Sequence, residues 1–356
     1  MGQWAISVNQ SQAREAIAAH IASLRVVGQD FGDVSPWPGL LRCLVLGGMC
    51  LGAVVLAWQS PGWTGFLGWT VLGAIAYGFW LVCTHDGIHH TLTGWVWFDE
   101  LMSRLISWPI LWGVGTYSAL HRFHHSWNGI NLADPERVQW TLDEYQAAGP
   151  IQQWYVRHQW AIDCFGTGSL GLIFNVFQKG WRHRQDQLVR QQLVLDVAGM
   201  IALHSLLLIA VIRGGAGWRY LVFWLVVERI VGVMMQARDH LEHYGLWQQG
   251  INHQFTQLAA SRNVATTPIV NWLMGGLPYH ALHHAFPQIP FYALPEADRR
   301  VREILGEVAP MTCDRGYWRT AIRLSQNPAV IGPQNEQIAI APPTFTHRPK
   351  PNPPGI

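Results

Sequence analysis

The stretch "WTGFLGWTVLGAIAYGFWLVCT", residues 63–84, contains no charged residue. A helix needs about 20 mostly apolar residues to cross the hydrocarbon core of a bilayer. The stretch therefore predicts a transmembrane helix, and this prediction decides the class of fold. The residues that follow, "HDGIHH" at 85–90, place polar side chains directly at the end of the predicted span.

Further stretches of the chain are also long and apolar enough to cross a bilayer. The predicted spans are residues 40–58, 63–84, 193–212 and 220–236. The loops "QSPG" and "RGGAG" join them in pairs and predict two helical hairpins. The last span contains Glu228 and Arg229, which are costly in lipid and should face protein or a polar cavity.

The apolar segment from Leu105 to Leu120 is interrupted by Pro109 and two glycines, and we expect it not to span. With two hairpins only, residues 1–38, 85–191 and 238–356 lie on one side of the membrane. Nearly all Lys and Arg residues then lie on that side, which the positive-inside rule identifies as the cytoplasm.

The composition agrees with a membrane protein. Charged residues make up 13% of the chain, and there are 20 tryptophans. A typical soluble domain has about 25% charged residues, and Trp is enriched at membrane interfaces. The net charge of +2 and the lack of a basic run argue against nucleic acid as a partner. The five cysteines form no CxxC pair and predict neither a disulfide framework nor a zinc knuckle.

Histidines form four clusters that flank the predicted spans. The clusters are "HDGIHH" (85–90), "HRFHH" (121–125), "DHLEH" (239–243) and "HALHH" (280–284). Within them, histidines recur at spacings of three and four residues, which lie on one face of a helix. A neutral imidazole is a good ligand for Fe, Zn, Cu and Ni. In the two-hairpin topology all four clusters lie on the same side, and together they predict a metal site.

The number of histidines predicts two metals rather than one. Eight of them occupy three boxes: His85, His89, His121, His124, His125, His280, His283 and His284. With His243, they exceed the four ligands of one tetrahedral site. No Glu-x-x-His or HExxH motif occurs, so the site differs from that of the soluble di-iron carboxylate proteins.

These boxes, HxxxH followed by HxxHH twice, resemble those of the membrane-bound fatty acid desaturase superfamily. That superfamily includes membrane hydroxylases and carotenoid ketolases. "NGINLADPE" after the second box, "SRNV" at 261–264 and "HHAFPQIPFYALPE" after the third box extend the resemblance. It covers roughly residues 63–296.

The resemblance implies two irons held by the box histidines and by one histidine after the fourth span, which His243 matches. Some relatives have an Asn four residues earlier that contributes through water, whereas this chain has Asp239. His90 and His240 are additional histidines that could join the metals. Other residues that could bind metal or support the ligands are Asp86, Asp134, Asp239, Glu242, Asn128 and Asn263.

The expected fold is an all-α integral membrane protein. Two transmembrane hairpins would carry a cytoplasmic helical cap that holds the histidine-rich di-metal site. We divide the chain into an amphipathic N-terminal segment (1–38), a desaturase-like membrane domain (39–325) and a proline-rich C-terminal tail (326–356).

The resemblance implies an oxidoreductase that uses O₂ to desaturate a fatty acyl chain of a lipid. The chain has no cytochrome b5 or iron–sulfur motif, so a separate donor of ferredoxin or cytochrome b5 type is expected. Arginines at 182, 184, 299, 300 and 302 could form its docking site. The alternative is a hydroxylase or ketolase of a carotenoid or another long apolar substrate. A metal transporter or a zinc membrane hydrolase is a more distant alternative.

Overall fold

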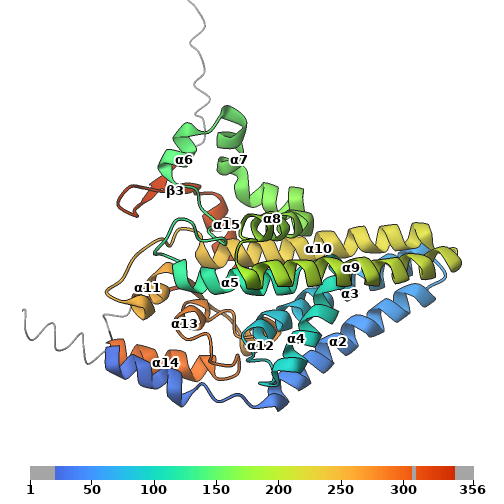
Figure 1. Ribbon diagram of the computed structural model, residues 1–356, viewed down its shortest axis with the longest axis horizontal. Coiled ribbons are helices and arrows are strands. Elements are labelled where there is room, and N and C mark those ends of the chain that lie inside the picture. Colours follow the sequence, from blue (N-terminus) through green and yellow to red (C-terminus); the bar gives the residue numbers. More distant parts are fainter. Residues whose placement is uncertain (1–20, 307–309, 341–356) are drawn as a thin grey trace, which may run out of the picture.

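The computed structural model describes residues 21–306 and 310–340, and most of them are helical (Figure 1). The helices and strands are α2 (Pro36–Gln59), α3 (Trp63–Ile88), α4 (Val96–Ser107), η1 (Trp108–Ile110), α5 (Val114–Trp127), α6 (Leu142–Ala147), α7 (Pro150–Ala161), the π-helix η2 (Ile162–Thr167), α8 (Gly168–Arg182), α9 (Gln187–Arg213), α10 (Gly217–His243), α11 (His253–Ala260), β1 (Arg262–Ala265), α12 (Pro268–Leu273), α13 (His280–Ala285), α14 (Leu294–Leu305), β2 (Thr312–Arg315), α15 (Tyr317–Ser325), β3 (Ala329–Ile331) and β4 (Gln337–Ala339).

The four predicted spans correspond to the four longest unbroken helices, α2, α3, α9 and α10. Each helix extends beyond the predicted apolar stretch, and α10 extends it from residue 236 to His243. In Figure 1 these helices run side by side, and the loops 60–62 and 214–216 lie at their right-hand ends. The Arg219 guanidinium donates to the Ser60 carbonyl across 3.1 Å, which joins the first turn of α10 to the loop 60–62. His85 lies near the end of α3, and His243 at the end of α10, that is farther from these loops.

The second pair of helices is not a closely packed hairpin. α2 packs along α3, whereas α10 packs mainly on α3 and α8 and has little contact with α9. α9 instead packs against α5. The short loop 214–216 therefore joins two helices, α9 and α10, that pack against different parts of the protein.

The segment 105–120 does not form a single helix, because it is divided among α4, η1 and α5. The break follows Pro109, and Leu111 adopts a left-handed φ of 63°. Asp196 of α9 is buried, and its carboxylate accepts from the backbone N–H of Thr116 at 2.7 Å. A carboxylate at a helix N-terminus is favourable, so Asp196 anchors the start of α5, the helix that carries the second histidine box.

A fifth stretch, residues 150–182, is also long and apolar enough to cross a membrane, and the sequence reading did not include it. It consists of α7, η2 and α8, and the π-helix and Gly168 break its regularity. Of the charged pair inside α10, Glu228 is buried as predicted, whereas the Arg229 side chain contacts η2 but is 39% exposed. Glu228 accepts from the backbone N–H of Leu170 at 3.1 Å, and Arg229 donates to the Phe165 carbonyl at 2.9 Å.

Two small sheets depart from the all-α expectation. β1 and β2 pair in parallel, and β3 and β4 form an antiparallel hairpin. The β3–β4 hairpin begins the predicted tail, whose residues 341–356 lie outside the described part of the chain. Residues 1–20 of the predicted amphipathic N-terminal segment lie outside the described part of the chain. Residues 21–30 are helical, and Leu24 and Val27 are buried against α13 and α14.

Candidate metal centre

Nine histidines gather at the ends of α3 and α10. α3 contributes His85 and, at its C-cap, His89, while α10 contributes His243. The other two boxes lie on α5 (His121, His124, His125) and on α13 (His280, His283, His284). Because spacings of three and four residues share a helix face, each helix points its imidazoles toward the others.

Eight of these imidazoles form two groups of four. In the first group, the ligand nitrogens of His85, His89, His121 and His283 lie within 4.8 Å of one another. In the second group, those of His124, His243 and His284 do the same. The second group also includes His280, whose Nε2 lies 2.9 Å from Nε2 of His243.

The ninth imidazole, that of His125, lies between the two groups. Its Nε2 lies 3.0 Å from Nε2 of His121 in the first group. Its ring stacks on that of His284 in the second group, with centroids 4.3 Å apart.

Outer hydrogen bonds hold three of the rings with Nε2 facing inward. Nδ1 of His121 lies 2.7 Å from Oε1 of Glu136, and Nδ1 of His124 lies 2.9 Å from the Asp134 carboxylate. Nδ1 of His284 lies 3.0 Å from Oε1 of Gln257. Metal-bound histidines commonly use the outer nitrogen in this way, which fixes tautomer and orientation.

Many inward nitrogens are buried and have no hydrogen-bond partner among the described residues. They include Nε2 of His85, His89, His283 and His284. Buried polar atoms in native proteins are nearly always paired, and an ion is one of the few explanations for such orphans. The donor set therefore fits metal ions that accept imidazole ligands, such as iron or zinc.

The electrostatics keep most of the rings neutral. Burial, with a contribution from neighbouring imidazoles, lowers the pKa of His121, His125, His283 and His284 well below the ordinary value. His124 differs: burial lowers its pKa, but the Asp134 and Glu136 carboxylates outweigh burial and raise it to about 9. Metal binding requires neutral imidazole, so most of the ligand set is already in its binding state.

The additional histidines lie outside the two groups. His90 has a left-handed φ of 55° and lines a separate small cavity with Ser103 and Gln192. His240 has Nε2 3.0 Å from Oδ2 of Asp163 and Nδ1 3.0 Å from the Gln236 carbonyl.

Two of the predicted supporting acids lie away from the histidine rings. Asp86 forms a buried ion pair with Arg42 at 2.5 Å, and among the described residues it makes no hydrogen bond to a histidine ring. Asp239 lines a cavity and belongs to neither group.

Two of the predicted acids do contact histidines. Asp134 hydrogen-bonds His124 as described above, and Oε2 of Glu242 lies 3.4 Å from Nε2 of His280.

Of the predicted asparagines, Asn128 donates to Oε1 of Gln257 at 3.2 Å, the same oxygen that contacts Nδ1 of His284. Asn263 accepts from the backbone N–H of Ala281 at 2.9 Å and anchors the start of α13.

Two supporting residues were not among those selected from the sequence. Glu136 lies in "ADPE", the same short motif as Asp134, so its position in the sequence could have indicated a supporting role. Gln257 lies in α11, which has no histidine box, and only the packing of α11 on α13 brings it to His284.

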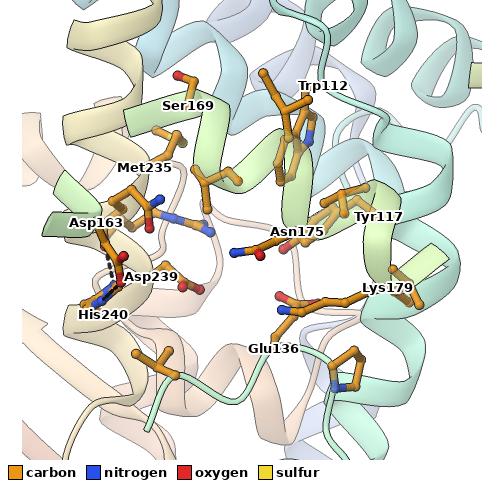
Figure 2. Close-up of a pocket in the computed structure, with 18 of the residues that line it drawn as sticks. Trp112, Tyr117, Glu136, Asp163, Ser169, Asn175, Lys179, Met235, Asp239 and His240 are labelled. Carbon is orange, nitrogen blue, oxygen red and sulfur yellow. Dashed lines mark hydrogen bonds and ion pairs between the residues drawn. The ribbon is translucent and has the colours of Figure 1, made fainter. Parts of the chain in front are cut away.

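A cavity of about 250 Å³ adjoins the histidines (Figure 2). It lies between α3, α8 and α10, and its wall includes His85 and Glu136. Figure 2 shows Trp112 and Met235 toward one end, and Asp239, Glu136 and Lys179 toward the other. The cavity therefore has an apolar part and a polar part, and it reaches the metal centre.

Comparison with known proteins finds similarity to fatty acid desaturases, both in a family profile and in individual relatives. The profile described as fatty acid desaturase matches residues 61–315. The sn-1 oleoyl-lipid 12-desaturase of Arthrospira platensis is 22% identical over 260 residues, which cover 69% of this chain and 70% of that protein. The Delta(8)-fatty-acid desaturase of Euglena gracilis is 23% identical over 69% of this chain and 68% of its own length.

A relative with a different reaction also matches. Alkane 1-monooxygenase 1 of Pseudomonas aeruginosa is 24% identical over 256 residues, which cover 69% of this chain and 59% of that protein.

Proposed function

Because the chain belongs to the membrane fatty acid desaturase family, we propose that it is an O₂-dependent di-iron enzyme that desaturates a fatty acyl chain of a membrane lipid. The observation that carries this proposal is the arrangement of nine imidazoles in and between two groups, with Nε2 atoms facing inward. A structural role does not account for so many buried and unpaired nitrogens.

The residues divide into those that would hold iron and those that support them. The first group would hold one iron and the second group the other, with His125 between them. When bound, the irons supply the activation of O₂ and the oxidising equivalents for the C–H bond. Glu136, Asp134 and Gln257 fix the rings, and burial of the groups excludes water.

The cavity beside His85 would hold the reacting part of the substrate. Trp112, Ile173 and Met235 offer an apolar surface to a hydrocarbon chain. α8 and α10 carry exposed apolar side chains such as Phe174 and Leu225, which suit contact with lipid. An acyl chain could therefore reach the metal centre from the bilayer with its apolar part against these side chains.

Hydroxylation is the second candidate reaction, and the similarity to an alkane monooxygenase favours keeping it. Both reactions begin at an unactivated C–H bond and need the same metal centre. The substrate in that case would be an alkane-like chain or a carotenoid. The product distinguishes the two reactions.

Electrons would come from a ferredoxin or a cytochrome b5-type protein on the cytoplasmic side. The arginines of α14 are less available for this partner than the sequence suggested. Arg299 pairs with Glu296 and Glu303, and Arg302 pairs with Asp298 at 2.7 Å. Arg182 and Arg184, at the end of α8, have no carboxylate partner among the described residues and would carry more of the attraction.

The test is expression with a ferredoxin or cytochrome b5 donor in a host that supplies both acyl lipids and carotenoids. We expect two irons per chain and a new double bond in an acyl chain. His283→Ala should lose iron and product, whereas His253→Ala, on the exposed start of α11, should keep both.

An oxygenated product would move the proposal to a hydroxylase or ketolase. Bound zinc without iron would reject O₂ chemistry in favour of a zinc hydrolase or transporter. Two irons without any oxidised lipid or carotenoid would contradict both proposed reactions.

A further inference from the structure

Glu242 occupies an unusual place beside the second histidine group. It lies in the last turn of α10, directly before His243, and its side chain is only 2% exposed. Consecutive residues on a helix point in different directions. Here, however, His280 of α13 lies between them, 3.4 Å from Oε2 of Glu242 and 2.9 Å from Nε2 of His243.

The position of this carboxylate differs from that of the other two carboxylates at the centre. Asp134 and Glu136 each approach the outer nitrogen, Nδ1, of a histidine. Glu242 instead approaches Nε2 of His280, the same atom that faces His243. It therefore lies on the inner side of the rings, among the atoms that converge. The ligand atoms of Glu242, His243 and His280 all lie within 4.8 Å of one another.

Its protein neighbours do not satisfy this carboxylate. Oε1 of Glu242 has no hydrogen-bond partner among the described residues. Nε of Arg238 lies 3.8 Å from Oε2, too far for a hydrogen bond, and this Nε is itself without a partner. A buried carboxylate without hydrogen bonds is costly unless a cation compensates it. The Arg238 side chain supplies only part of that compensation.

A hydrogen bond from His280 to Glu242 would not resolve the arrangement. If Nε2 of His280 carried the proton for such a bond, it could not also bind a metal. Nδ1 of His280 is buried without a partner among the described residues, so no outer group selects either tautomer of this ring. A cation placed among Glu242, His243 and His280 would satisfy all three at once.

We propose that Glu242 is a direct carboxylate ligand of the metal bound by the second histidine group. This inference rests on the proposed di-iron function and refines it. The two metals are then unequal: the first has only nitrogen ligands from the protein, and the second has nitrogens and one anionic oxygen. The carboxylate lowers the net positive charge at that metal by one and makes it the harder of the two sites.

The test compares Glu242→Gln and Glu242→Ala with the control Arg238→Met. The control removes the neighbour that pairs with Glu242 without removing an inner-side atom. Iron per chain, iron Mössbauer spectra and the cobalt stoichiometry of the apo-protein are measured, none of which depends on turnover. Circular dichroism and unfolding of the apo-proteins check that each variant folds.

We expect wild type and Arg238→Met to bind two metals and to show two unequal iron signals. Glu242→Ala should bind one metal tightly, and Glu242→Gln should change the Mössbauer signal of the second iron even where that iron stays bound. Two metals with unchanged spectra in both Glu242 variants would overturn the assignment and leave the di-iron proposal intact. A wild-type protein that binds no iron would instead reject the proposed function.

Discussion

At the scale of single residues, burial gives the polar side chains their roles. Arg42 lies in α2, is fully buried, and forms an ion pair with Asp86, next to His85. Its guanidinium also donates to the Leu273 carbonyl at 3.2 Å and lies 5.0 Å from the centre of the Phe291 ring. One side chain therefore ties α2 and α3 to the segments on either side of the third histidine box.

Replacement of Arg42 by Met should destabilise the protein strongly. Loss of one partner leaves a buried charge uncompensated, which typically costs about 3–5 kcal/mol. Thermal unfolding in detergent measures the effect, and Arg182→Met, at an exposed arginine that forms no ion pair within residues 21–306 and 310–340, is the control. Equal unfolding temperatures for the two variants would show that the buried pair contributes little.

At the scale of elements, the region from α7 to α8 could not be assigned from the sequence. α7 carries Arg157 and several amides, and the chain then changes from α-helix to π-helix at Ile162. Tyr155 and His240 both hydrogen-bond the Asp163 carboxylate, at 2.8 and 3.0 Å, which holds η2 against α10. Hydropathy gives only the average character of this stretch. The π-helix and the hydrogen bonds to Asp163 depend on the folded structure.

Labelling of introduced cysteines tests whether residues 150–182 cross the membrane. We expect Gln146→Cys and Arg190→Cys to react with an impermeant maleimide from the same side, because Arg157 and the amides of α7 would be costly in lipid. Arg213→Cys, at the last residue of α9, should react only from the opposite side. Cys313→Ser removes the exposed native thiol, since the other four cysteines are buried.

Reaction of Gln146→Cys and Arg190→Cys from opposite sides would instead make this stretch a fifth span. The two-hairpin topology would then be replaced. The same labelling pattern would test the proposed cytoplasmic position of the histidines.

At the scale of the whole molecule, the candidate metal centre joins parts of the chain that are far apart in sequence. Its nine histidines run from His85 to His284 and come from α3, α5, α10 and α13. A ligand that binds only the folded state stabilises it, by about 2.7 kcal/mol at a concentration 100 times the dissociation constant. Bound metal should therefore hold these helices together.

Removal of metal with a chelator should lower the unfolding temperature. Hydrogen exchange should rise most in α13 and α5, where buried imidazoles would be left without partners, and least in the middle of α2. Readdition of iron should reverse both changes. Uniform exchange along the chain, or an unchanged unfolding temperature, would indicate that the centre does not stabilise the fold.

The sequence by itself determined the four long apolar helices, the four histidine clusters and the family. These features are local, since a span depends on consecutive apolar residues and a box depends on spacing along one helix. Only the tertiary structure decided which histidines meet, because His90 and His240 share the local pattern of the others but point elsewhere. It also decided the contacts of Gln257, Glu242 and Arg42. Those contacts depend on distances between atoms of separate helices, which no spacing in the sequence encodes.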